Sequence, residues 1–281
     1  MTPLSVFLIV LAGVTGVAVG SFLNVVAYRV PAGISLLRES RCPQCDVPIR
    51  TRNNLPVISW FLLRGRCADC GSPISPRYPL VEAVTGVAFA AAAWWGVRAL
   101  APAAIGPVSS GDVWALWLVV IAFLYFAAIS VALTLIDLDT RRLPNAIVLP
   151  SYAVAGILFT LAAALGAQWD ALLRAGIGMV VLYAFYLLLR SVRPGGMGGG
   201  DVKLAGVVGM YLGWTGWGAL AVGSFAAFLY GGIFGVLLLI AGRAGRRTAI
   251  PFGPWMLLGA WTGVLAGDAI GLWYVDLVVG V

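Results

Sequence analysis

Long apolar segments alternate with short polar ones along almost the whole chain. A membrane-spanning helix needs roughly 20 apolar residues, and eight segments approach that length. The sixth is short and interrupted by glycine, and its boundary with the seventh is weak because residues 213–223 carry no charge. The pattern predicts an all-α polytopic membrane protein with about eight transmembrane helices. The segments are 4–27, 79–101, 113–136, 146–166, 172–190, 203–220, 221–242 and 252–275.

The composition excludes an ordinary soluble domain. Of the 281 residues, 61% are hydrophobic and 10% are charged, whereas soluble domains carry about 25% charged residues. The net charge of +7 is compatible with nucleic-acid binding, but the basic residues lie between the apolar segments, where membrane topology explains them. We therefore expect contact with a lipid bilayer and none with nucleic acid.

The basic residues also predict the orientation of the chain, since Lys and Arg are enriched on the cytoplasmic side of a membrane. With the N-terminus outside, 16 of the 18 basic residues fall inside, and only Arg98 and Arg174 fall outside. The first apolar segment has no basic region before it, so we interpret it as a retained span rather than a cleaved signal peptide. The inside segments are 28–78, 137–145, 190–203 and 243–247.

One long polar segment divides the chain. We expect a first transmembrane helix at 1–27, a small cytosolic domain at 28–78 and a multi-span membrane domain at 79–281. About fifty residues are few for a hydrophobic core, and domains of this size usually need disulfides or a structural metal.

All four cysteines lie in the polar segment as two C-x-x-C pairs, Cys42 with Cys45 and Cys67 with Cys70. Four thiolates suit tetrahedral Zn²⁺ and leave no position for a catalytic water. Two disulfides or free thiols are the alternatives, although disulfides rarely persist in the cytosol. We expect a structural zinc site in a small cytosolic loop domain.

The chain has no histidine, which removes Ser-His-Asp and Cys-His hydrolases and histidine-ligated zinc proteases. Chemistry must therefore rest mainly on the 11 acidic residues. Six of them lie in the polar loop, in outside connections or near the C-terminus, where a solvated role is expected. Five lie within or beside apolar segments, where acids are functional candidates: Glu82, Asp137, Asp139, Asp201 and Asp268.

Asp137 and Asp201 are expected at the inside ends of their helices, on the same membrane face. Two carboxylates close together can share one proton, so that one acts as acid and the other as base. Such a pair activates water for attack on a peptide carbonyl. Asp139 competes with Asp137, because residues two apart on a helix point about 200° apart and only one is expected to face Asp201.

Five of the seven residues 195–201 are glycine, and the run ends at Asp201. Glycine allows tight turns and the close approach of another chain. We therefore expect an extended substrate to bind along the backbone of Gly198, Gly199 and Gly200, with a flexible linker as the alternative. Lys203, the only lysine, is a further candidate for substrate binding, with an interfacial anchor as its alternative role.

Together, these segments resemble the type IV prepilin peptidases, membrane aspartic proteases with a G-x-G-D motif. "GSFLNVVAYRVP", "CPQC" and "SWFLLRGRCADCGSPISPRYPLVE" resemble the family's cytosolic region. "IDLDTRRLPN" resembles its first aspartate motif, "GMGGGDVKLAGVVGMYLGW" its second, and "IPFGPWMLLGA" its last segment. The resemblance covers nearly the whole chain.

The resemblance implies that Asp137 and Asp201 are the catalytic pair. Asp137 is preferred to Asp139 because the family's first motif counts six residues from its aspartate to a leucine, here Leu143. Asn145 stands where many relatives have Asp. The implied partners are prepilins and pseudopilins, whose leader peptides are cut at the cytosolic face of the inner membrane. A second activity, N-methylation of the new amine with S-adenosylmethionine, rests on the resemblance alone.

Two other functions remain as alternatives. An ion-coupled transporter also has buried acids and glycine-broken helices, but its acids would lie near the midplane and internal repeats would be expected, and no repeat is evident here. A non-catalytic secretion-system scaffold would tolerate loss of both aspartates. The oligomeric state, the pilin that is cut and the roles of Glu82 and Asp268 stay open.

Overall fold

The computed structural model of the protein describes residues 2–100, 109–166, 168–193, 196–242 and 251–280. The predicted basic segment 243–247 lies outside the described residues. Within them the fold is helical, and the β contacts are two isolated bridges in the polar loop.

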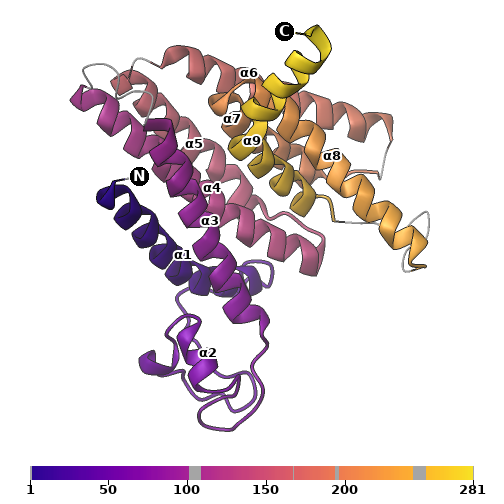
Figure 1. The fold of residues 1–281 in the computed structure, drawn as a ribbon. Coiled ribbons are helices and arrows are strands. Elements are labelled where there is room, and N and C mark those ends of the chain that lie inside the picture. Colours follow the sequence, from indigo (N-terminus) through magenta and orange to yellow (C-terminus); the bar gives the residue numbers. More distant parts are fainter. Residues whose placement is uncertain (1, 101–108, 167, 194–195, 243–250, 281) are drawn as a thin grey trace. The chain divides into compact units, whose positions relative to one another are not determined.

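Every predicted apolar segment is a helix, with ends that differ from the prediction by no more than five residues. The polar loop between the first two long helices carries a short 3₁₀ turn and a short helix, α2 (Ile58–Leu62). The long helices (Figure 1) are α1 (Pro3–Arg29), α3 (Arg77–Leu100), α4 (Ser110–Thr140), α5 (Asn145–Gly166), α6 (Trp169–Val192), α7 (Gly199–Thr215), α8 (Trp217–Ile240) and α9 (Gly253–Val279).

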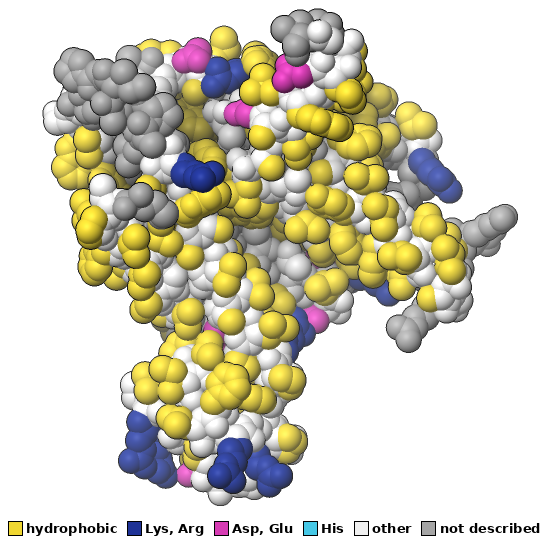
Figure 2. Space-filling view, viewed as in Figure 1, with side chains coloured by type: hydrophobic (Ala, Val, Ile, Leu, Met, Phe, Trp, Pro, Cys, Tyr) yellow, Lys and Arg dark blue, Asp and Glu magenta, His cyan; other side chains and the backbone are white. Residues whose placement is uncertain are grey.

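Seven of these helices are long and apolar enough to cross a membrane, so the chain is a multi-pass membrane protein. Hydrophobic side chains cover much of the helical surface in Figure 2, as expected where lipid is the solvent. The eighth long helix, α7, has 17 residues and is about 25 Å long, whereas the hydrocarbon core is roughly 30 Å thick. It ends early because Gly216 interrupts the apolar segment in an extended conformation.

The helices form two compact units. The first contains α1, the polar loop, α3 and the middle of α4, Phe123–Ala132. α1 and α3 pack closely because glycines face the partner helix. A Cβ at Gly16 would lie 2.7 Å from Cβ of Phe89, and one at Gly20 would lie 2.7 Å from Cα of Glu82. A larger residue at either position would force the two helices apart.

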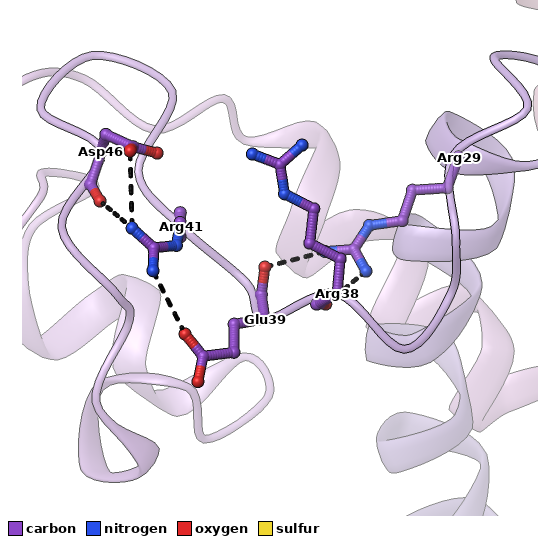
Figure 3. Close-up of polar contacts among 5 residues, drawn as sticks. All are labelled: Arg29, Arg38, Glu39, Arg41 and Asp46. Atoms are coloured by element: carbon purple, nitrogen blue, oxygen red, sulfur yellow. Dashed lines mark hydrogen bonds and ion pairs between the residues drawn. The ribbon is translucent and has the colours of Figure 1, made fainter.

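The polar loop is tied to α1 by one buried arginine, Arg29, which is 8% exposed at the end of the helix. Figure 3 shows its guanidinium reaching into the loop, where Arg41 also lies between the carboxylates of Glu39 and Asp46, 3.4 Å from each. The Arg29 side chain donates hydrogen bonds to backbone carbonyls of the irregular loop, groups that need a partner when they are removed from water. These carbonyls belong to Ser35, Leu36, Arg38 and Glu39.

The second unit contains the two ends of α4 and helices α5 to α9. Helix α7 is its centre, since it contacts α5, α6, α8 and α9, and every residue from Leu204 to Trp214 is buried. Gly178 of α6 lies against Gly209 of α7 with backbone touching backbone. Asp201 lies in the first turn of this enclosed helix, so the candidate site is attached to the most deeply buried element of the unit.

Candidate active site and metal centre

Asp137 lies in the last turn of α4 and is 4% exposed. Its Oδ2 accepts a hydrogen bond of 3.0 Å from the backbone N–H of Gly253, the first residue of α9. Asp139, two residues later, is exposed. The end of α4 therefore turns Asp137 into the unit and Asp139 toward the surface, as the helix geometry requires.

Asp201 is the third residue of α7. Its Oδ2 accepts a hydrogen bond of 3.0 Å from the backbone N–H of Gly198, the residue that precedes the helix. A carboxylate in the first turn satisfies a free N–H there and is favoured by the helix dipole. Asp137 and Asp201 are thus held alike, each by one oxygen on a glycine N–H at the start of a helix.

The two aspartates lie in the same unit, and their charges interact electrostatically. The charge of Asp201 also acts on the buried hydroxyl of Tyr186 in α6. The end of α4 and the start of α7 therefore bring together the two carboxylates that the sequence pairs. Their catalytic role stays a prediction.

The glycine run has a packing role in this structure. Gly198 precedes α7 in an extended conformation, and Gly199 and Gly200 begin the helix. A Cβ at Gly199 would lie 2.5 Å from Nη1 of Arg190, and one at Gly200 would lie 2.8 Å from Cβ of Leu143. Side chains of this same chain therefore approach the glycine backbone closely. Binding of an extended substrate along it stays a prediction.

Lys203 connects the two aspartate motifs. Its Nζ donates a hydrogen bond of 2.9 Å to Oδ1 of Asn145, the first residue of α5. Its backbone carbonyl accepts a hydrogen bond of 2.5 Å from the hydroxyl of Tyr152, also on α5. Lys203 therefore has structural partners on α5, and its part in substrate binding stays a prediction.

Two acids left open by the sequence have structural neighbours. Glu82 of α3 is 7% exposed and accepts a hydrogen bond of 2.6 Å from the backbone N–H of Val57, so it fixes the polar loop to α3. Asp268 of α9 lies at the start of α8, where its Oδ1 is 3.0 Å from the position of a Cβ at Gly216 and 2.8 Å from one at Gly218. A carboxylate at a helix N-terminus is stabilised by the helix dipole.

The four cysteine sulfurs gather at one point of the polar loop, all within 4.8 Å of one another. The sulfurs of Cys42 and Cys70 are 3.9 Å apart. Zinc with four thiolates at about 2.3 Å requires sulfurs about 3.8 Å apart. The cluster could therefore hold Zn²⁺ with Cys42, Cys45, Cys67 and Cys70 as a complete ligand set, and such a closed set is structural rather than catalytic.

The cysteine pairs belong to a repeat of nine residues, "RCPQCDVPI" at 41–49 and "RCADCGSPI" at 66–74. Each copy closes with the same hydrogen bond, from Cys42 to the carbonyl of Val47 and from Cys67 to that of Ser72. The expectation that the chain has no evident repeat is therefore wrong for the loop; the repeat was missed because it is short and only five of its nine letters are shared. The equivalent bridges join Arg41 with Pro48 and Arg66 with Pro73, and Asp46 and Gly71 both have positive φ.

Local hydrogen bonds give the thiols different acidities. The backbone N–H groups of Cys45 and Gln44 lower the pKa of Cys42 to about 6, and the Ser72 hydroxyl lowers the pKa of Cys70. At Cys45 the N–H of Val47 acts to lower the pKa, but burial and the neighbouring sulfurs outweigh it, and the pKa rises to about 12. Cys42 and Cys70 thus favour the thiolate form that binds a cation.

The contacts that Gly253 and Leu143 make at the aspartate site are features that the sequence did not reveal. Gly253 lies 116 residues after Asp137, and no periodic pattern reports a contact between backbone and side chain at that distance. The available signal was the Gly-Pro pair at the start of the last apolar segment, since proline in the first turn marks a helix N-terminus with free N–H groups.

Comparison with known proteins gives matches along the chain. Residues 14–96 match the Bacterial Peptidase A24 N-terminal domain, and residues 124–240 match the Type IV leader peptidase family. A protein from Aeromonas hydrophila named prepilin leader peptidase/N-methyltransferase is 35% identical, over 91% of this chain and 90% of its own. Proteins of the same name from Neisseria gonorrhoeae and Myxococcus xanthus are 35% and 38% identical, over 96% and 87% of this chain and 94% and 66% of their own. No solved structure matches the chain at a significant level.

Proposed function

We propose, because the chain belongs to the type IV leader peptidase family, that it is a membrane aspartic endopeptidase that removes the leader peptides of type IV prepilins and pseudopilins. The observation that carries the proposal is the pair Asp137 and Asp201, two carboxylates whose charges interact, each held by a glycine N–H. Two carboxylates with one proton between them are sufficient for acid–base hydrolysis, and the chain has no histidine to offer instead.

In the proposed reaction, the ionised carboxylate removes a proton from water as the water oxygen attacks the peptide carbonyl carbon. The protonated carboxyl gives its proton to the carbonyl oxygen, so a tetrahedral diol forms without charge separation. When the diol collapses, the carboxylate that gave up its proton takes one back from a diol hydroxyl, the C–N bond breaks, and the leaving amine takes the proton that came from water. The pair then again holds one proton, ready for the next turnover.

The proposed site faces the cytosol of the inner membrane. The distribution of charge supports this orientation, because Arg141, Arg142 and Lys203 lie beside the two aspartates in sequence and basic residues mark the cytosolic side. A substrate would keep its basic leader in the cytosol and place its apolar helix in the lipid, so that the scissile bond reaches the carboxylates at the interface.

We also propose that the chain N-methylates the amine it releases, as the names of its relatives indicate. The methyl donor would be S-adenosylmethionine. The zinc proposed at the four cysteines would hold the polar loop folded, since a four-thiolate ion has no free coordination position for substrate.

The test is cleavage of a purified prepilin in detergent, with Asp137→Asn, Asp201→Asn and Asp139→Asn compared with the wild type. We expect the first two substitutions to lower kcat by more than about 10³-fold, because each removes one half of the acid–base pair. Asp139→Asn should retain cleavage, because its side chain is exposed. Cleavage by both Asp137→Asn and Asp201→Asn would refute the aspartyl pair.

Failure of the folded wild type to cut a range of prepilins would favour the alternatives of an ion-coupled transporter or a secretion-system scaffold. Proton-coupled uptake by proteoliposomes, abolished by Asp137→Asn, would identify the transporter.

A further inference from the structure

We propose that Gly253 is a positioning residue for the reaction: its backbone N–H, at the start of α9, fixes the carboxylate of Asp137 in its working orientation. This inference rests on the proposed function and adds to it a residue from the last helix. The contact is direct, with 3.0 Å between the Gly253 nitrogen and Oδ2 of Asp137, in a buried environment.

The first turn of α9 leaves this N–H available to a side chain. The N–H groups of Trp255 and Met256 both donate to the carbonyl of Phe252, at 3.1 Å each. Pro254 has no N–H. The first N–H groups of a helix have no partner within the helix, and here the one at Gly253 is directed at Asp137. The hydrogen bond uses Oδ2 of Asp137.

Position 253 has no room for a side chain. A Cβ there would lie 2.8 Å from Oδ2 of Asp137 and 3.4 Å from Cδ2 of Leu143. Leu143 is in turn 2.8 Å from the position of a Cβ at Gly200, the neighbour of Asp201. Leu143 therefore fills the space between Gly253, which holds Asp137, and Gly200, which precedes Asp201. A methyl group at 253 would displace the carboxylate or Leu143.

The start of α9 is itself held in place. The ring of Phe252 packs against Phe228 of α8 and Tyr186 of α6, with centroid distances of 5.3 and 6.1 Å, and Phe228 and Tyr186 are 5.5 Å apart. Two aromatic side chains from two other helices thus pack against Phe252, the residue before Gly253. An N–H anchored in this way restrains the carboxylate of Asp137 more tightly than a mobile side-chain donor would.

Gly253→Ala tests the steric half of the inference in the full-length protein. A displacement of a catalytic group by about 1 Å costs roughly 100-fold in rate, so we expect kcat for prepilin cleavage to fall about 100-fold while KM stays within about twofold. Gly232→Ala is the matched control, because a Cβ at Gly232 in α8 would meet no atom within 4 Å. Thermal unfolding shows whether each variant is folded. The number of prepilin molecules bound per enzyme gives the fraction of competent sites, and kcat is expressed per competent site.

A second variant tests the hydrogen bond without adding bulk. Replacing Gly253 by glycolic acid converts the amide to an ester and removes only the N–H. We expect kcat to fall at least about tenfold, with binding stoichiometry and KM unchanged, since one hydrogen bond to a charged group is worth about 1.5–3 kcal/mol. Wild-type kcat in the ester variant would overturn the inference even if Gly253→Ala fails to fold.

The two proposals fail in different ways in this assay. If the wild type cuts and Asp137→Asn does not, while both Gly253 variants cut at the wild-type rate, the aspartyl peptidase stands and the positioning role falls. If the folded wild type does not cut, the proposed function falls, and the positioning role falls with it.

Discussion

At the scale of single residues, the metal centre depends on protons. Zinc binds thiolates, so any thiol that is protonated in the free loop must release its proton when the metal binds. The thiol of Cys45, with a pKa of about 12, is protonated at neutral pH. The thiol of Cys42, with a pKa of about 6, is mostly ionised there and becomes protonated only in more acidic solution.

We therefore expect the apparent zinc affinity of the purified protein to rise with pH. The displacement of the Cys45 proton alone gives about a tenfold gain per pH unit around neutrality. Below about pH 6 the slope should steepen, because Cys42 then also carries a proton. Competition with a chromophoric chelator at a series of pH values measures this, with Cys45→Ser as the control that removes the first proton. An affinity independent of pH would contradict the thiolate site.

The sequence could predict residues that act through their spacing along the chain, but not residues that act through contacts formed only when the helices pack. Cys42, Cys45, Cys67 and Cys70 could be grouped because ligand spacing is local along the chain. The contact of Gly253 with Asp137 could not be found, because it is made by a backbone N–H whose direction depends on how α9 packs. The choice of Asp137 over Asp139 needed the resemblance, and the structure adds that one is buried and the other exposed.

At the scale of the elements, α6 and α7 cross with their backbones in contact. A Cβ at Gly178 of α6 would meet the carbonyl oxygen of Gly209, and would lie 3.3 Å from Cα of Gly213. Small residues at a crossing allow the close packing that associates helices in membranes, where there is no hydrophobic driving force between them. The crossing fixes α7 relative to α6, and with it the turn that carries Asp201.

Gly178→Ala is accordingly expected to destabilise the protein, by about 1–3 kcal/mol, because backbone atoms cannot move aside as a flexible side chain can. Gly176→Ala, two residues away on α6, is the matched control: a Cβ there meets nothing within 4 Å, and Ala favours a helix over Gly. Thermal unfolding in detergent separates the two variants. Equal unfolding temperatures would show that the crossing does not depend on the glycine.

Hydropathy was sufficient to locate the helices, since a segment that cannot hydrogen-bond to lipid must form a helix. It was insufficient for α7, which was expected at 203–220 and runs from Gly199 to Thr215. The start lies earlier because Gly199 and Gly200 join the helix once the carboxylate of Asp201 accepts a hydrogen bond from the N–H of Gly198. The helix also ends earlier than expected, because it is interrupted at Gly216. The surrounding segment has no charged residue, so its composition does not show where the helix ends.

At the scale of the whole molecule, charge determines orientation. Figure 2 shows Arg side chains gathered on the polar loop, which holds Arg38, Arg41, Arg50, Arg52, Arg64 and Arg66. Within the second unit, α4 ends and α5, α7 and α9 begin around the aspartates. An enzyme with its site at this end can meet only those substrates whose cleavage region is on the same side of the bilayer.

The orientation can be tested with the cysteines, all of which lie in the loop. After zinc is removed by a chelator, a membrane-impermeant maleimide should label them in inside-out vesicles and leave them unlabelled in intact spheroplasts. Asp170→Cys at the start of α6, an exposed position, should add one site that is labelled only in spheroplasts. The reverse pattern would place the loop outside and refute a cytosolic site.

The hydrogen bond between α4 and α9 also affects when, during synthesis of the chain, the site can be completed. A ribosome completes Asp137 early and adds Gly253 116 residues later. Until the last helix emerges and inserts, the nascent chain carries both carboxylates but lacks the donor that orients the first of them. The enzyme would thus reach its full rate only when its own biogenesis is complete, and translation stalled before the final helix would leave an inserted product with a much lower kcat.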